Sequence, residues 1–327
     1  MTSPLSEDDL IARYFAPIAG PGALGLKDDA ACIAAPDGCD LILTKDVVVA
    51  GVHFFANDPP ASIARKALRV NISDLAAKGA DALGFLLALA MPSHIDAAWL
   101  ADFARALGED AALYEIPLLG GDTVKTSGPL MISITALGSA PKGDMARRTG
   151  ARDGDRLYVS GTIGDAAIGL KLRMGEGPEG LSQGARMHLL QRYLEPQPRY
   201  VLRHVWRDFA NGAMDVSDGL VGDVTKMLKA SGVSARVRLA EAPLSVAARE
   251  AIALDPALFD IAMTGGDDYE LLASVARERA AEFEAAARRA GVALTHIGDV
   301  VSSVDAPEFF GRDGARRIFA RGSYSHF

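Results

Sequence analysis

The order of hydrophobic and polar residues predicts strands and helices that take turns along the chain. The segment 82–90 is apolar at nearly every position, which predicts a strand covered on both faces and central in its sheet. The segment 59–78 repeats apolar residues every three or four positions, which predicts a long helix. The same reasoning predicts further strands at 30–35, 40–49, 116–119, 129–137, 156–160, 213–216, 234–239, 269–275 and 295–300. It predicts helices at 6–18, 96–108, 165–174, 185–193, 199–210, 220–229, 245–254 and 277–290.

Polar residues interrupt the predicted strand 40–49, which carries Thr44, Lys45 and Asp46 in its middle. An edge strand that faces water would explain them, and so would a binding site. His53 follows shortly afterwards between apolar neighbours. A lone histidine in such a place is more often a satisfied structural group than a ligand.

A basic, glycine-rich segment at 142–155 separates the two halves of the chain. The length of 327 residues favours about two domains. We therefore expect one domain at 1–142 and a second at 143–327. An arginine of this segment would suit a phosphate group, and the alternative is a solvated linker.

The stretch Met214-Asp215-Val216-Ser217-Asp218-Gly219-Leu220 has the pattern of a strand end that turns into a helix start. Free N–H groups at a helix start favour anions, but two aspartates would repel a bare phosphate. A phosphate bridged by a divalent metal ion would fit there. The alternative is that Asp215 or Ser217 merely caps the helix.

Similar acidic turns recur along the chain, and several of them follow strand-like runs. They are Lys27-Asp28-Asp29-Ala30, Thr44-Lys45-Asp46, Asn71-Ile72-Ser73-Asp74-Leu75, Gly120-Gly121-Asp122-Thr123 and Gly265-Gly266-Asp267-Asp268. Their recurrence predicts one acidic site gathered from distant parts of the sequence.

Composition narrows the class of protein. A net charge of −8 argues against binding to nucleic acid or to an anionic membrane. The two cysteines, Cys32 and Cys39, show no metal-binding spacing and predict a reduced, cytoplasmic protein. The acidic N-terminus lacks a signal-peptide pattern, and the apolar run 82–91 is too short to span a bilayer.

Converging carboxylates predict an all-oxygen metal site, which suits Mg²⁺, Mn²⁺ or Ca²⁺. Such ions clamp phosphates and assist phosphoryl transfer. The chain has no Walker A loop, no protein-kinase motif set and no recognisable Ser/His/Asp triad. A two-metal hydrolase stays open, because the same ligands could hold an attacking water. A non-enzymatic divalent-metal-binding or scaffold protein is the alternative of another class.

An ordered series of short motifs runs along nearly the whole chain. The motifs are Gly25-x-x-Asp28-Asp29-Ala30, Thr44-x-Asp46, Gly51-Val52-His53-Phe54, Val70-Asn71-x-Ser73-Asp74-Leu75-Ala76, Gly120-Gly121-Asp122-Thr123, Met214-Asp215-x-Ser217-Asp218-Gly219-Leu220, Gly265-Gly266-x-Asp268-Tyr269-Glu270-Leu271 and His326-Phe327. This series resembles the thiamine-monophosphate kinase family. Aminoimidazole-ribonucleotide synthetase and selenophosphate synthetase belong to the same superfamily and are the nearest alternatives. The chain has no cysteine in a glycine-rich N-terminal loop, which argues against the selenophosphate synthetase type.

The resemblance implies a two-domain α+β fold of the aminoimidazole-ribonucleotide-synthetase type, with a mixed sheet and helices in each domain. The N-terminal domain would bind metal and ATP and form a homodimer, and the C-terminal domain would complete the ATP and substrate site. It also implies ATP-dependent, Mg²⁺-assisted, in-line phosphorylation of thiamine monophosphate to thiamine diphosphate.

The resemblance also assigns roles to individual residues. Several Mg²⁺ ions would be held by Asp29, Thr44, Asp46, Asp74, Asp122, Asp215 and Asp218. ATP would contact Gly121, Asp122, Arg148 and Ser217, and the substrate would contact His53, Asp267 and Tyr324. The metals and Arg148 would screen two anions from each other, and no general base would be required.

Two positions depart from the family pattern. Lys45 stands where the family usually has Thr or Ser, and one hypothesis is that its ammonium supplies a charge that elsewhere comes from a metal ion. Asp267 stands where Glu is more common, and its shorter side chain would need a water to reach the substrate.

Overall fold

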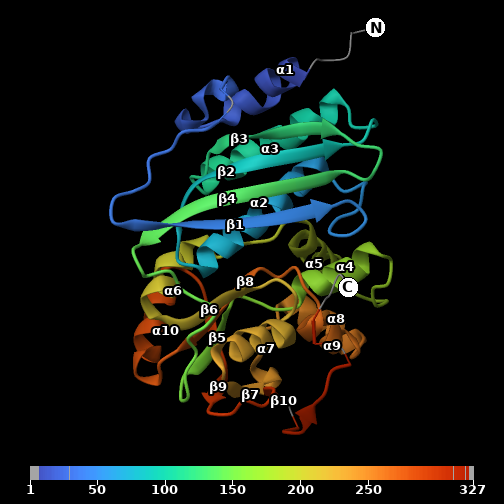
Figure 1. The fold of residues 1–327 in the computed structure, drawn as a ribbon. Helices are drawn as coiled ribbons and strands as arrows, with labels where there is room; N and C mark the ends of the chain where they lie inside the picture. Colours follow the sequence, from blue (N-terminus) through green and yellow to red (C-terminus); the bar gives the residue numbers. More distant parts are fainter. Residues whose placement is uncertain (1–6, 29, 312, 321, 324–327) are drawn as a thin grey trace. The chain divides into compact units, whose positions relative to one another are not determined.

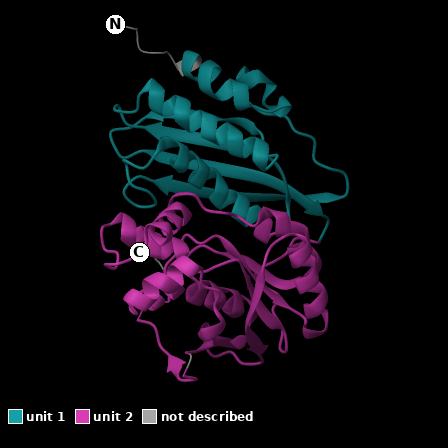
Figure 2. Cartoon of the chain, turned by 180° about the vertical axis from the view of Figure 1, so that it is seen from behind, with its two compact units in different colours: residues 1–75, 80–143 teal, residues 76–79, 144–327 magenta. Residues whose placement is uncertain are grey.

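The computed structural model describes residues 7–28, 30–311, 313–320 and 322–323 (Figure 1). Asp29, Tyr324 and the terminal His326-Phe327 therefore lie outside the described residues. The chain forms two compact units, drawn in different colours in Figure 2. Unit 1 comprises residues 1–75 and 80–143, and unit 2 comprises residues 76–79 and 144–327.

Unit 1 is built on a four-stranded mixed sheet with the order β1-β4-β2-β3. Its strands are β1 (Cys39–Val49), β2 (Asp81–Met91), β3 (Leu118–Lys125) and β4 (Met131–Pro141). Only β2 and β3 pair in parallel, and β2 is central as predicted. Its main helices are α2 (Pro60–Ala77) and α3 (Ala97–Leu113), which lie against one face of the sheet in both views (Figures 1 and 2).

Strand β1 shows how the sheet divides into a covered and an open face. Ile42 and Val48 are buried, whereas Leu43 between them is 63% exposed. Because successive side chains of a strand point to opposite faces, the two sets occupy different sides. We call the less covered side the open face; its exposed apolar residues are Leu41, Leu43, Val47, Leu86, Val124 and Met131.

The N-terminal segment differs from the predictions in two respects. The predicted helix 6–18 is a short α-helix, α1 (Glu7–Leu10), followed by a π-helical turn and a 3₁₀ turn. The predicted strand 30–35 is wrong, because this stretch joins no ladder of the described sheets. The backbone N–H of Cys32 donates instead to the carbonyl of Gly22 in the preceding 3₁₀ segment.

Unit 2 is built on a seven-stranded mixed sheet with the order β11-β10-β7-β9-β5-β8-β6. Its strands are β5 (Arg156–Ser160), β6 (Ala210–Val216), β7 (Ser234–Arg238), β8 (Glu270–Val275), β9 (Leu294–Val301), β10 (Glu308–Phe310) and β11 (Arg316–Arg317). Its helices are α4 (Asp165–Arg173), α5 (Gln183–Leu194), α6 (Arg203–Phe209), α7 (Leu220–Ser231), α8 (Val246–Leu254), α9 (Leu258–Thr264) and α10 (Ala280–Arg289).

Two apolar clusters hold unit 2 together. The larger contains side chains of α4, α5, α7, α8 and α9 with strand residues such as Met214 and Leu272. The other centres on Trp206 and Phe283, whose ring centroids lie 5.1 Å apart, with Tyr158 beside them. Each unit is thus a mixed sheet packed with helices, which confirms the predicted α+β fold class. Among the described helices, none has the length and apolarity needed to cross a membrane.

Candidate functional site

Strand β6 ends in the acidic stretch that the sequence singled out. Asp215 lies in the last part of β6 and is only 7% exposed. The N-cap of α7 is Gly219, at φ +116°, and it makes no side-chain capping bond. The alternative that Asp215 or Ser217 caps the helix is therefore wrong.

A lysine neutralises part of this acidic stretch. The Lys226 ammonium of α7 donates to a carboxylate oxygen of Asp218 and, at 2.9 Å, to Asp223. The backbone N–H of Asp218 donates to the second oxygen of Asp223 at 2.9 Å. Burial raises the pKa of Asp223, although Lys226 opposes this shift. The pKa of Lys226 is also raised: burial lowers it, but the carboxylates of Asp218 and Asp223 together raise it by more. Sequence reasoning missed Asp223 and Lys226, although their i, i+3 spacing puts them on one face of α7.

Residues 217–219 form a first loop, between β6 and α7. A second loop, 265–269, lies directly against the end of β6. The N–H of Asp267 donates to the carbonyl of Ser217, and that of Tyr269 donates to the carbonyl of Val216, both at 2.9 Å. β6 and β8 are antiparallel neighbours with Val216 opposite Glu270. The structure thus brings the predicted Ser217 and Asp267 together within unit 2.

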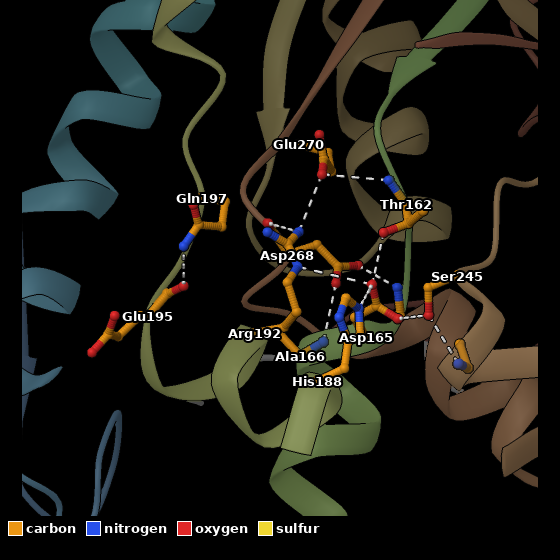
Figure 3. Close-up of polar contacts among 12 residues, drawn as sticks. Thr162, Asp165, Ala166, His188, Arg192, Glu195, Gln197, Ser245, Asp268 and Glu270 are labelled. Atoms are coloured by element: carbon orange, nitrogen blue, oxygen red, sulfur yellow. Dashed lines mark hydrogen bonds and ion pairs between the residues drawn. The ribbon is translucent and has the colours of Figure 1, made fainter. Parts of the chain in front are cut away.

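Behind the second loop lies a buried polar network that sequence reasoning did not identify (Figure 3). Asp165, Asp268 and Glu270 are at most 1% exposed, and Arg192 is 7% exposed. Their spacing in the sequence offers no signal, because α4, α5 and the segment 268–270 at the start of β8 bring them together only in the folded unit. Buried charges of this kind require partners, and each carboxylate accepts several hydrogen bonds.

In unit 1 the predicted metal ligands Thr44 and Asp74 are in direct contact. The Thr44 hydroxyl donates to a carboxylate oxygen of Asp74, which belongs to α2. Asp46 is two residues from Thr44 on β1 and therefore shares its face of the sheet. Because β1 is an edge strand, this position also accommodates polar residues without a metal.

The open face of unit 1 carries a pocket of about 750 Å³. Its polar lining includes Asp28, Lys45, Asp122 and Ser133. The Lys45 ammonium donates to the Ser133 hydroxyl at 2.7 Å. A cavity of this size falls in the range of small-molecule sites.

Gly121 lines the same pocket and lies inside β3, where the sequence had predicted a turn after residue 119. A Cβ atom on Gly121 would lie 1.7 Å from the carbonyl oxygen of Leu87 in the neighbouring strand. Close strand approach therefore gives Gly121 a structural reason besides the predicted contact with ATP.

The acids of unit 1 do not form one cluster. Across the sheet, Asp46 of β1 lies opposite Ile134 of β4, which lies opposite Leu87 of β2, which in turn lies opposite Gly121 of β3. Three strand spacings therefore separate β1 from β3 along this row. Three spacings amount to roughly 14 Å. Asp122 and Asp46 of one chain therefore cannot bind the same ion, and together they require separate ions.

Two further predicted residues have identifiable contacts. The ring Nδ1 of His53 accepts from the N–H of Val49 at 3.1 Å, so the turn after β1 orients this ring. The side chain of Arg148 is exposed, and its backbone carbonyl accepts from the Ser231 hydroxyl. Asp29 and Tyr324 are not described. Within the described residues, no three His, Cys, Asp or Glu side chains form a ready-made metal cluster.

Comparison with known proteins covers both units. Residues 27–140 match the family model of the AIR synthase related protein, N-terminal domain. Residues 152–306 match the model of the AIR synthase related protein, C-terminal domain. A thiamine-monophosphate kinase from Caulobacter vibrioides is 46% identical over 317 residues, which cover 95% of this chain and 89% of that protein.

Solved structures show the same similarity. A thiamine-monophosphate kinase from Stenotrophomonas maltophilia K279a superposes with a TM-score of 0.81 at 35% identity, covering 89% of this chain and 91% of that one. A structure of AaThiL complexed with AMPPCP and TMP superposes with a TM-score of 0.78 at 28% identity over 100% of both chains.

Proposed function

The chain belongs to the thiamine-monophosphate kinase family of AIR synthase related proteins, and from this premise we propose that it transfers the γ-phosphoryl group of ATP to thiamine monophosphate. The products are thiamine diphosphate and ADP. The observation that carries the proposal is the full-length match to AaThiL complexed with AMPPCP, an ATP analogue, and TMP. Members of the family are phosphotransferases, and the two-metal hydrolase and scaffold alternatives lose their support.

The donor set of this chain fits Mg²⁺. Thr44, Asp46 and Asp74 offer oxygen ligands on one face of unit 1, and Asp122 offers a carboxylate on the other. In unit 2, Asp218 offers a carboxylate, and one of its oxygens accepts a hydrogen bond from the Lys226 ammonium, which a bound metal ion would replace. We assign these residues, with Asp29 and Asp215, to several ions. Bound Mg²⁺ would neutralise charge between the two phosphate-bearing substrates.

The remaining contacts are proposed from the family resemblance. Gly121 and Asp122 are assigned to ATP, and their position in the pocket of unit 1 supports this assignment. Arg148 and Ser217 are assigned to ATP from the resemblance alone. His53, Asp267 and Tyr324 are assigned to thiamine monophosphate. The acceptor phosphate is itself the nucleophile, so the chain's residues hold two anions in line and no proton is abstracted.

Lys45 is expected to reduce the enzyme's need for Mg²⁺, because its ammonium lines the same pocket as Asp28 and Asp122. Lys45→Thr should raise the Mg²⁺ concentration at half-maximal rate several-fold. The measurement is a Mg²⁺ titration of initial rates at fixed ATP. Lys142→Thr, at an exposed position beyond β4, is the control. An unchanged Mg²⁺ requirement in Lys45→Thr would refute this role.

We further propose that the chain forms a homodimer through the open face of unit 1. Leu41, Leu43, Val47, Leu86, Val124 and Met131 expose apolar surface on this face. Exposed apolar patches of this kind mark interaction sites. A second copy presenting the same patch would satisfy it with two-fold symmetry.

Leu43→Glu should dissociate the dimer, because Leu43 is the most exposed apolar residue of β1 at 63% and a carboxylate there would be buried in the interface. Sedimentation velocity at micromolar concentration should give a dimer for the wild type and a monomer for the variant. Val304→Glu, at a side chain that is 94% exposed in unit 2, should remain a dimer. A Leu43→Glu protein that sediments with the wild type would disprove this interface.

The proposed activity can be tested against its nearest alternatives by offering different acceptors with ATP and Mg²⁺. ATP consumption should be stimulated by thiamine monophosphate and not by selenide or by the formylglycinamidine ribonucleotide used by aminoimidazole-ribonucleotide synthetase. Stimulation by either of the latter would assign the chain to another activity.

We place the enzyme in the cytoplasm, since Cys32 and Cys39 are free thiols.

A further inference from the structure

The backbone of the loop 265–269 is in direct contact with the backbone at the end of β6. Besides the two hydrogen bonds from Asp267 and Tyr269 to the β6 end, the glycine at position 266 lies very close to it. A Cβ atom on Gly266 would be 2.3 Å from the carbonyl oxygen of Ser217. The placement of this loop is therefore determined closely by its neighbours.

Two residues of this loop adopt an unfavourable backbone conformation. Asp267 has φ +73° and Tyr269 has φ +52°, in the left-handed region that side-chain-bearing residues avoid. Such conformations persist only where the surrounding structure holds them, and they gather at functional sites. Between and after them, Asp268 and Glu270 point inward and are 1% and 0% exposed. The buried side chains of Asp268 and Glu270 are thus placed to hold the backbone of Asp267 and Tyr269 in its strained conformation.

Asp268 is anchored at the start of α4. Its carboxylate accepts from the backbone N–H of Gly164 at 2.6 Å and of Ala166 at 3.3 Å. Burial raises the pKa of Asp268 well above its usual value, although these hydrogen bonds oppose the shift. The two N–H groups belong to the helix start, where backbone donors lack partners inside the helix.

Glu270 is held by two arginines and a serine. Arg199 donates to both carboxylate oxygens, from Nε at 2.7 Å and from Nη2 at 2.5 Å. The Ser160 hydroxyl donates at 2.7 Å. Arg199 therefore neutralises Glu270.

Arg192 of α5 joins the two anchors. Its Nη2 donates to Glu270 Oε1 at 3.1 Å and to the backbone carbonyl of Asp268 at 3.2 Å (Figure 3). Its Nε lies 3.8 Å from a carboxylate oxygen of Asp165. The planar guanidinium group of Arg192 thus bonds to the carbonyl of Asp268, which lies between the strained residues Asp267 and Tyr269.

We propose that Arg192 is a positioning residue that holds the loop 265–269 in its left-handed conformation at Asp267 and Tyr269. In this conformation the loop presents Asp267 to thiamine monophosphate. The inference rests on the proposed function, in which Asp267 contacts the substrate. Arg192 is 7% exposed and acts through the backbone of Asp268, without touching the substrate. The thiazolium ring of thiamine is a cation, so a displaced Asp267 carboxylate weakens binding more than phosphoryl transfer.

The primary variant is Arg192→Lys, which keeps a positive charge beside Glu270 but loses the planar fork. The Kd of thiamine monophosphate, measured by calorimetry with Mg²⁺ and no ATP, should rise about tenfold. The KM for thiamine monophosphate should rise with it, while kcat and the KM for ATP stay within about twofold. An unchanged Kd for thiamine monophosphate would overturn the proposal.

Arg199→Lys is the matched control, because it disturbs the same buried carboxylate while leaving the bond to the Asp268 carbonyl. It should lower the unfolding midpoint about as much as Arg192→Lys, with little change in the Kd of thiamine monophosphate. If both variants weaken binding in proportion to their loss of stability, the role of Arg192 is merely structural and the proposal fails.

A double-mutant cycle tests the route from Arg192 to the substrate. If Arg192 acts through Asp267, Asp267→Asn combined with Arg192→Lys should bind no more weakly than Asp267→Asn alone. Additive losses would contradict this route. Failure of the proposed function gives a different result, because the wild-type protein would then show neither binding of thiamine monophosphate nor ATP turnover stimulated by it.

Discussion

Asp215→Asn should lower kcat by about 10²–10³-fold, the scale expected when one charged group at a phosphoryl-transfer site is removed. Asn has nearly the same shape but lacks the negative charge that the proposed metal requires. Asp215 sits on β6 opposite Leu271 of β8, and this backbone ladder does not depend on its side chain. The variant should therefore fold normally. Steady-state rates with saturating ATP and thiamine monophosphate measure the effect, alongside circular dichroism.

Asp208→Asn is the control for this substitution. Asp208 lies in the same unit, its side chain is 60% exposed, and its ion pair with Arg207 is 3.7 Å long. Exposed pairs of this kind contribute little, so its kcat and stability should match the wild type. Near-normal turnover in Asp215→Asn would remove Asp215 from the metal site.

Gly266→Ala should lower kcat/KM for thiamine monophosphate by about 10²-fold, because a small displacement at a reacting site is sufficient for such a loss. The added Cβ would lie 2.3 Å from the Ser217 carbonyl and 3.3 Å from the Asp218 Cα. The backbone must move, so the two loops separate and Asp267 and Asp218 lose their relative placement. The same strain should cost about 1–3 kcal/mol of unfolding free energy.

Gly184→Ala serves as the control for backbone effects of the glycine substitution. Gly184 lies in α5, and a Cβ there meets nothing within 4 Å. Alanine in an open helical position should stabilise the fold by up to about 1 kcal/mol and leave kcat/KM unchanged. A Gly266→Ala enzyme as active as Gly184→Ala would show that the tight contact between the loops is irrelevant to function.

Periodicity was sufficient to predict most of the regular elements. The apolar run at 82–90 became the central strand β2, and the segment 59–78 became α2, because long patterns of one period allow few alternatives. Short elements were harder. Helix α9 (Leu258–Thr264) and strands β10 and β11 were not predicted, since two to seven residues carry too little pattern.

Glycine misled the prediction at β3. A Gly-Gly pair usually marks a turn, yet Gly120 and Gly121 continue the strand to Lys125. The parallel pairing with β2 requires a residue without a side chain at Gly121, and that requirement depends on a partner strand distant in sequence. Local chemistry cannot reveal such a contact.

The candidate site shows the same division. Acidic motifs led to Thr44 and Asp74, which the structure brings into contact, and to Ser217 and Asp267, whose loops share hydrogen bonds. The sequence could not predict that β1 and β3 hold their acids at opposite edges of the sheet, because strand order is a property of the tertiary structure. Arg192 was missed for the same reason.

The most direct test of the central claim is the product balance of the purified protein incubated with ATP, Mg²⁺ and thiamine monophosphate. Chromatographic analysis should show thiamine diphosphate and ADP formed in equal amounts, with no reaction when Mg²⁺ is chelated. ADP formed without thiamine diphosphate, or no consumption of ATP at all, would contradict the account.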